Sequence, residues 1–176
     1  MTSDAPAGFA EVYDAHIQKI YAFVYYRVQH REIAEDLTST TFLKALDKYA
    51  TFHGGNVRAW LYRIARNTVT DHYRTHRPPA DLETAQEVQS TSNPAHDAET
   101  RMQLERVRAE LEKLPEDQRD IVLMRVWDGL THAEIADVLG KSEASVKMQF
   151  SRSLRQLQSA LPLAAFLLFL TLHTHA

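Results

Sequence analysis

Residues 130–154, LTHAEIADVLGKSEASVKMQFSRSL, have the pattern of two helices joined by a tight turn. Thr131 followed three residues later by Glu134 matches a capping box, which starts a helix through reciprocal hydrogen bonds. Gly140 is a residue type that ends helices, and Ser142 is one that begins them. The spacing predicts a short helix, a three-residue turn and a longer helix, the order of a helix-turn-helix motif. An antiparallel helical hairpin with a solvated basic face remains the alternative.

The second of these helices carries most of the positive charge of the motif. Residues 141–155 contain four basic side chains and one acidic side chain. In a helix-turn-helix the second helix enters the DNA major groove, and its early residues reach base edges. Val146 and Phe150, four residues apart, are expected on its buried side. The candidates for DNA contact are Lys141, Ser145, Lys147, Met148, Ser151, Arg152 and Arg155.

The whole chain has a formal net charge of -3, which does not by itself favour binding to a polyanion. The acidity is concentrated in residues 78–100, which contain five acidic residues and no Lys or Arg. Residues 55–77, by contrast, carry five basic residues and one acidic residue. Because local potential decides where a polyanion docks, the net charge does not contradict the helix-turn-helix prediction.

Three amphipathic helices are predicted in the first half of the chain. Apolar residues recur every three or four positions from Phe9 to Val28, within residues 31–49 and from Val57 to Tyr73. No strand-like alternation competes, so the predicted fold class is all-α, with a small helical bundle before the helix-turn-helix domain. On the second helix the residues expected to face inward are Ile33, Leu37, Phe42, Ala45 and Leu46. On the third they are Val57, Trp60, Leu61, Ile64, Ala65, Thr68, Val69, His72 and Tyr73.

Residues 78–100 are rich in Pro, Ser, Thr and Gln, which predicts a flexible linker. The linker divides the chain into one helical domain over residues 1–77 and a second over residues 101–160. The remaining residues, 161–176, form an apolar tail of unknown role. Its most apolar part would span only about 18 Å as a helix, against about 30 Å for a bilayer's hydrocarbon core. Packing onto the second domain, binding to a partner or a membrane surface, and a terminus without a role remain open.

Residues 58–77 interleave basic and aromatic side chains, which suits a surface that holds a nucleic-acid backbone while rings stack on bases. Trp60, Tyr62 and Tyr73 are the candidate rings. Trp60 also lies on the apolar stripe, so a place in the core is its better interpretation. The basic residues are equally compatible with a solvated helix face.

Nothing in the sequence favours an enzyme. There is no cysteine, no Gly-rich phosphate loop and no Ser/His/Asp pattern, and the nine histidines are scattered. Glu35 and Asp36 are neighbours on a predicted helix and would point about 100° apart, which argues against a catalytic carboxylate pair. We therefore expect no catalytic residue, metal site, cofactor or small-molecule substrate. The N-terminal sequence lacks the basic and apolar segments of a secretory signal, so a cytoplasmic protein is expected.

Two blocks of the sequence together resemble sigma factors of bacterial RNA polymerase, of the compact extracytoplasmic-function group. The first block contains AEDLTSTTFLKAL and RAWLYRIARNTVTDHYR, and the second is LPEDQRDIVLMRVWDGLTHAEIADVLGKSEASVKMQFSRSLRQL. They cover about residues 9–77, resembling sigma region 2, and 101–160, resembling sigma region 4. The resemblance implies that the chain binds core polymerase, recognises the minus-35 and minus-10 promoter elements and promotes transcription initiation. An anti-sigma factor, common in this family, is a candidate partner.

The resemblance also implies roles for individual residues. Glu35, Asp36, Leu37, Phe42 and Lys44 match the segment that docks on the largest polymerase subunit. His53, Asn56, Arg58, Arg63, Asn67 and Arg74 match positions that capture the minus-10 element as it melts. Lys147, Met148, Ser151 and Arg152 match the positions that face the minus-35 element, and the other three candidates of the second domain are expected to contact the same element. The acidic linker would thread through the channel later used by RNA.

Two other functions remain as alternatives. A polymerase-independent transcriptional regulator would use only the helix-turn-helix, and residues 101–176 alone would then bind a specific duplex. A membrane-associated adaptor would use the apolar tail, although membrane association is the less favoured role for that segment.

Overall fold

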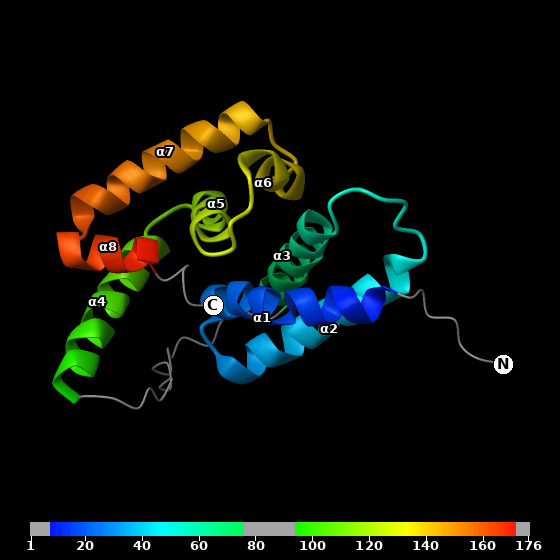
Figure 1. The fold of residues 1–176 in the computed structure, drawn as a ribbon, viewed down its shortest axis with the longest axis horizontal. Coiled ribbons are helices and arrows are strands. Elements are labelled where there is room, and N and C mark those ends of the chain that lie inside the picture. The colour runs from blue at the N-terminus through cyan, green and yellow to red at the C-terminus, as the bar shows by residue number, and fades with distance from the viewer. Residues whose placement is uncertain (1–7, 76–93, 172–176) are drawn as a thin grey trace. The chain divides into compact units, whose positions relative to one another are not determined.

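The computed structural model describes residues 8–75 and 94–171, and it confirms the all-α fold class (Figure 1). The described residues form helices and no strands, and the chain divides into two compact units. Residues 78–93 of the predicted linker and the last five residues of the tail lie outside the described ranges. Each unit has a hydrophobic core of its own, as the two blocks of the sequence predict.

The first unit consists of three helices, α1 (Phe9–Val28), α2 (Arg31–Tyr49) and α3 (Val57–Thr75), and each packs on the other two. Gln29 closes α1 in the left-handed conformation, with φ 56°, and its N–H donates to the carbonyl oxygen of Tyr25. The hydroxyl of Tyr73 donates to the carbonyl oxygen of Arg27 over 2.6 Å, which joins the end of α3 to the end of α1. The most deeply buried side chains are Ile20, Val24, Ala34, Ala45, Leu61, Tyr62, Ala65 and Val69.

Four burial predictions in this unit differ from the structure, and one of them concerns Tyr73, which is expected to face inward but is 38% exposed. Leu46 is exposed, because the contact face of α2 is formed by Leu37, Thr38, Thr41 and Phe42 together with Ala34 and Ala45. Tyr62, predicted as a ring for stacking on bases, is fully buried and packs edge-to-face on Phe23. Trp60 is half-buried rather than in the core, and its ring stacks on Phe52.

The second unit consists of α4 (Pro94–Glu112), α5 (Glu116–Val126), α6 (His132–Leu139), α7 (Glu143–Ala160) and α8 (Leu163–Thr171). Helix α4 begins within the predicted linker, so the prediction of a linker as far as residue 100 is wrong over its last seven residues. Proline is well suited to the first position of a helix. The features that mark residues 94–100 as linker-like are thus compatible with a helix start.

Helix α8 contains most of the described apolar tail and packs mainly on α4. Its inner face is buried through Ala165, Phe166 and Phe169. The indole Nε1 of Trp127, just after α5, donates to the carbonyl oxygen of Phe169 over 3.3 Å, and the two rings lie 5.7 Å apart. Of the three alternatives for the tail, the structure shows packing onto the second unit. No described helix has the length and apolar character needed to cross a membrane.

Candidate nucleic-acid and polymerase interfaces

The helix-turn-helix forms as its sequence predicts. The hydroxyl of Thr131 accepts from the backbone N–H of Glu134 over 3.2 Å, and the Glu134 carboxylate accepts from the backbone N–H of Thr131, which completes the capping box. Gly140 ends α6 in the left-handed conformation, with φ 64°, and Ser142 accepts from the N–H of Ser145 to begin α7. A short turn therefore separates α6 from the longer α7 that would enter a groove.

One face of α7 is held against the rest of the second unit. Val146, Ser153 and Leu157 are buried on this face. The hydroxyl of Ser153 donates to the side-chain carbonyl oxygen of Gln118 over 3.1 Å, which connects α7 to α5. Phe150 is half-buried and packs edge-to-face on the ring of His132 at 5.5 Å. These contacts determine which side of α7 faces outward.

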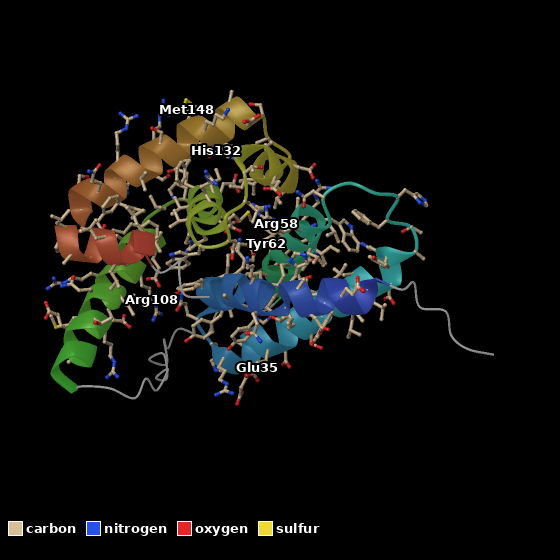
Figure 2. All side chains as sticks on the ribbon, viewed as in Figure 1. Glu35, Arg58, Tyr62, Arg108, His132 and Met148 are labelled. Atoms are coloured by element: carbon tan, nitrogen blue, oxygen red, sulfur yellow. The ribbon has the colours of Figure 1, made fainter. Side chains whose placement is uncertain are left out.

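The outward side of α7 presents five of the seven predicted minus-35 residues. Met148 is 47% exposed and projects from α7 in Figure 2. Lys147 is also exposed and lies 2.7 Å from the carboxylate of Glu143 one turn earlier. The hydrogen bond from Lys147 lowers the pKa of Glu143, so the carboxylate stays charged. The other exposed residues of this set are Ser151, Arg152 and Arg155.

Lys141 and Ser145 are instead tied into an internal network. The ammonium of Lys141 lies 2.6 Å from a carboxylate oxygen of Asp117 on α5 and donates to the side chain of Gln149 over 3.4 Å. The amide nitrogen of Gln149 in turn donates to the hydroxyl of Ser145 over 2.9 Å. The two residues are thus engaged in orienting α7 against α5. This network depends on α5, which lies well before the motif in the chain, so the motif alone could not predict it.

The predicted minus-10 residues divide between a loop and one helix. His53 and Asn56 lie in the exposed loop before α3, where the side chain of Asn56 accepts from the backbone N–H of Ala59 and caps the helix. Arg63, Asn67 and Arg74 are exposed along α3, and Arg74 pairs with Asp71 at 3.2 Å. Arg58 is half-buried (Figure 2) and lowers the pKa of nearby His16, although burial is the larger cause.

One aromatic residue of this region, Phe52, is not among the rings that the sequence predicts to contact nucleic acid. The ring of Phe52 stacks on the ring of Trp60, with centroids 4.7 Å apart and planes at 29°. Both rings are half-buried, and Phe52 directly precedes His53 in the loop before α3. Its position immediately before His53, Gly54 and Gly55 was the available signal. The pair places a flat apolar surface next to the polar residues of the loop.

The predicted polymerase-docking set on α2 is partly corrected by the structure. Glu35, labelled on α2 in Figure 2, and Asp36 are exposed, and Glu35 pairs with Arg31 at 2.8 Å. Phe42 is only 4% exposed and packs on the ring of Tyr13. Leu37 is also buried, so neither side chain is available to a partner. Lys44 is half-buried and donates to the hydroxyl of Thr68 on α3 over 3.2 Å.

Other apolar side chains occupy the exposed face of α2. Leu43 is 61% exposed, and Leu46, three residues later, is also exposed. Sequence periodicity assigned Leu46 to the core and did not single out Leu43. Two exposed leucines beside an exposed acidic pair form a surface that can bind a protein through both apolar and charged contacts.

Metal binding has no support in the described parts of the chain. Within residues 8–75 and 94–171, no group of three or more His, Asp or Glu side chains gathers around a common point. The sequence contains no cysteine that could replace them.

Two family models match the chain, each over one of the units. The model for sigma-70 region 2 matches residues 12–78, and the model for sigma-70 region 4 matches residues 104–157. The ECF RNA polymerase sigma factor BldN of Streptomyces coelicolor is 34% identical over 159 residues, which are 88% of this chain and 60% of that protein. The RNA polymerase sigma factor YlaC of Bacillus subtilis is 31% identical over 153 residues, covering 84% of this chain and 88% of YlaC.

A solved structure supports the same fold. The sigma factor RpoE from Bartonella quintana, solved in complex with the anti-sigma factor NepR, has a TM-score of 0.66 and 22% identity to this chain. The similarity covers 86% of this chain and 95% of the RpoE chain. Helix α8 lies entirely after the last residue matched by the region 4 model.

Proposed function

The chain belongs to the sigma-70 family of RNA polymerase sigma factors, within its extracytoplasmic-function group, and on that basis we propose that its two units read different promoter elements. The observation that carries the proposal is that regions 2 and 4 occur in the family's order on separate units, and each presents exposed polar and basic residues. A regulator that used only the helix-turn-helix would have no need for the region 2 unit.

We propose that α2 docks on core polymerase. Glu35 and Asp36 provide an exposed acidic pair, and the exposed Leu43 and Leu46 provide apolar contact area. An interface of this composition combines electrostatic steering with burial of apolar surface. Leu37 and Phe42 support the helix from within the core instead of contacting the partner.

We propose that the loop before α3 and the exposed face of α3 hold the minus-10 element. Arg63, Asn67 and Arg74 would contact the backbone, while the Phe52–Trp60 pair offers a surface for an unstacked base. Flipping a base costs a few kcal/mol, and stacking on an aromatic ring supplies about 1–3 kcal/mol per base. Backbone contacts must contribute the remainder.

We propose that α7 reads the minus-35 element in the major groove. Lys147, Met148, Ser151, Arg152 and Arg155 face outward, and the three basic residues among them would contact phosphates or base edges. Lys141 and Ser145 act by positioning α7. The domain boundaries at residues 77 and 160 remain proposals, with α4 extending the second domain back to Pro94.

We further propose that the protein acts in the cytoplasm, where promoter DNA and polymerase are found, and performs no covalent chemistry itself. Sigma factors are not enzymes, and the polymerase supplies the chemistry of RNA synthesis. The solved complex of RpoE with NepR supports an anti-sigma protein as a candidate regulator of this chain.

Runoff transcription with purified core polymerase tests the proposed function. Asp36→Arg should weaken core binding and reduce initiation without altering upstream duplex contacts. Lys147→Ala should leave core binding intact and weaken the holoenzyme on promoters. Glu105→Arg on α4 is a matched control, because it reverses an exposed charge on a helix that neither proposed surface uses. Tight binding of a specific duplex by residues 101–176 alone, together with an inert Asp36→Arg variant, would favour the polymerase-independent regulator.

A further inference from the structure

The first turns of α7 carry an exposed pair of opposite charges. The ammonium of Lys147 lies 2.7 Å from a carboxylate oxygen of Glu143, and both side chains are about half exposed. Glu143 is the one acidic residue in the otherwise basic stretch 141–155. A carboxylate next to DNA phosphates is repelled by them, so this position is unfavourable for affinity alone.

The pair presents an acceptor and a donor side by side. In the major groove, the edge of a G·C pair presents the N4 amino group of cytosine as a donor and the O6 and N7 atoms of guanine as acceptors. A carboxylate accepts well from cytosine N4, and a lysine donates well to guanine O6. The ammonium of Lys147 and the carboxylate of Glu143 are separated by the length of one hydrogen bond. Neighbouring donor and acceptor groups on the edge of one base pair are separated by a similar distance.

We propose that Glu143 is a specificity-determining residue, and that the Glu143–Lys147 pair together reads one G·C base pair of the upstream promoter element. Glu143 accepts from the cytosine, and Lys147 donates to the guanine. This inference rests on the proposed minus-35 role of α7. It differs from that role in assigning an acidic residue, absent from the predicted contact set, to base discrimination.

The neighbouring side chains favour this assignment. Lys141 pairs with Asp117, and Gln149 donates to Ser145, so these four side chains have partners within the unit. Glu143 lies in the first turn of α7, where recognition helices reach base edges. Its pairing with Lys147 keeps the carboxylate charged and limits its repulsion from phosphates. The pair therefore contributes selectivity at a small cost in affinity.

Holoenzyme binding to a pool of duplexes randomised over the upstream element tests the proposal. We expect the unchanged holoenzyme to prefer cytosine at one position by roughly 5- to 150-fold over the other bases. Glu143→Ala should reduce this preference by at least about fivefold, because only the contact of Lys147 with guanine then remains, and the preferences at other positions should be retained. Glu143→Gln should shift the same position towards adenine, since glutamine pairs with adenine N6 and N7.

Glu112→Ala is the control, because Glu112 also forms an ion pair with a basic residue four positions away, Arg108, on α4. It should leave every base preference unchanged. Circular dichroism of each variant verifies that the helices are retained. If Glu143→Ala strengthens binding equally to all sequences, or leaves the cytosine preference intact, the inference is overturned while the minus-35 role stands. If the unchanged holoenzyme shows no upstream preference at all, the proposed function of α7 itself fails.

Discussion

Lys141 lies 2.6 Å from Asp117, so the turn of the helix-turn-helix is joined to α5 by an ion pair. Neither side chain is fully exposed, and Lys141 also contacts Gln149 on α7. A residue that the sequence predicts to contact DNA therefore contacts three helices of the unit, since its backbone N–H also donates to the carbonyl oxygen of Ala136 on α6. Its charge is already partly neutralised within the protein, which reduces its value as a phosphate contact.

Asp117→Asn is expected to lower the free energy of unfolding by no more than about 1 kcal/mol, because the pair is partly solvated. It should lower the ratio of specific to non-specific duplex binding, since released Lys141 can contact any phosphate while α7 loses a support. Urea denaturation and holoenzyme binding at fixed salt measure the two effects. Glu105→Gln on α4 removes the same charge elsewhere and should change neither quantity. An unaltered specificity ratio in Asp117→Asn would contradict the positioning role of Lys141.

Phe42 and Leu43 are neighbours on α2, and replacing each with alanine is expected to affect a different property, stability for Phe42 and polymerase binding for Leu43. Phe42→Ala should lower the free energy of unfolding by about 3–5 kcal/mol, because it empties a core site beside Tyr13. Leu43→Ala should change stability by less than about 0.5 kcal/mol and weaken binding to core polymerase. Urea denaturation and competition for core polymerase separate these effects. Unchanged polymerase binding by Leu43→Ala would remove Leu43 from the proposed docking surface.

Phe169 and Leu167 test the packing of α8. Phe169→Ala should destabilise the second unit by up to about 3 kcal/mol, the loss being limited because a terminal helix can undock by itself. It should also shift Trp127 emission to longer wavelength, measured in a Trp60→Phe background that removes the other tryptophan. Leu167→Ala, at an exposed site on the same helix, should leave both quantities unchanged. Identical Trp127 emission in the Phe169→Ala variant would mean that α8 is not docked.

Acidification is expected to destabilise the protein through His132 and His16. Burial, followed by Arg125 and Lys147, lowers the pKa of His132, and burial with Arg58 and Lys19 lowers that of His16. The unfolded chain then takes up protons at a higher pH than the folded chain does. The contribution to stability is complete above the unfolded pKa and falls as the pH drops below about 6.5.

Urea denaturation at about pH 7.5 and about pH 5.5 measures this dependence. The unchanged protein should lose stability between the two values, and His132→Gln should lose less, since glutamine does not titrate. An equal loss in both proteins would show that His132 does not contribute.

The sequence predicts the helix ends and caps correctly where the residues of a single helix or turn determine them. The capping box of Thr131 and Glu134, the stop at Gly140 and the start at Ser142 all form as predicted. These features involve residues three or four apart, so their hydrogen bonds are defined by local geometry. The end of the predicted linker, residue 100, is wrong because α4 begins at Pro94. The sequence of residues 94–100 suits either a linker or a helix start, so local pattern cannot distinguish the two.

The burial of individual side chains is less well predicted. Leu46 and Leu43 differ from Phe42 in exposure because α1 and α3 cover one side of α2 and leave the other open. Periodicity identifies an apolar stripe, but its edges depend on how the neighbouring helices cross it. The assignment of Leu37 and Phe42 to a docking surface is corrected for this reason.

The sequence by itself determined the helices, the helix-turn-helix and membership of the sigma-70 family, because these depend on spacing, capping and motif order along the chain. The tertiary structure alone decided which residues of those motifs are available to partners. It engaged Lys141 with Asp117, buried Phe42 and exposed Leu43. The physical reason is that exposure and ion pairing depend on distances between residues, and packing sets those distances between helices that are far apart in the chain.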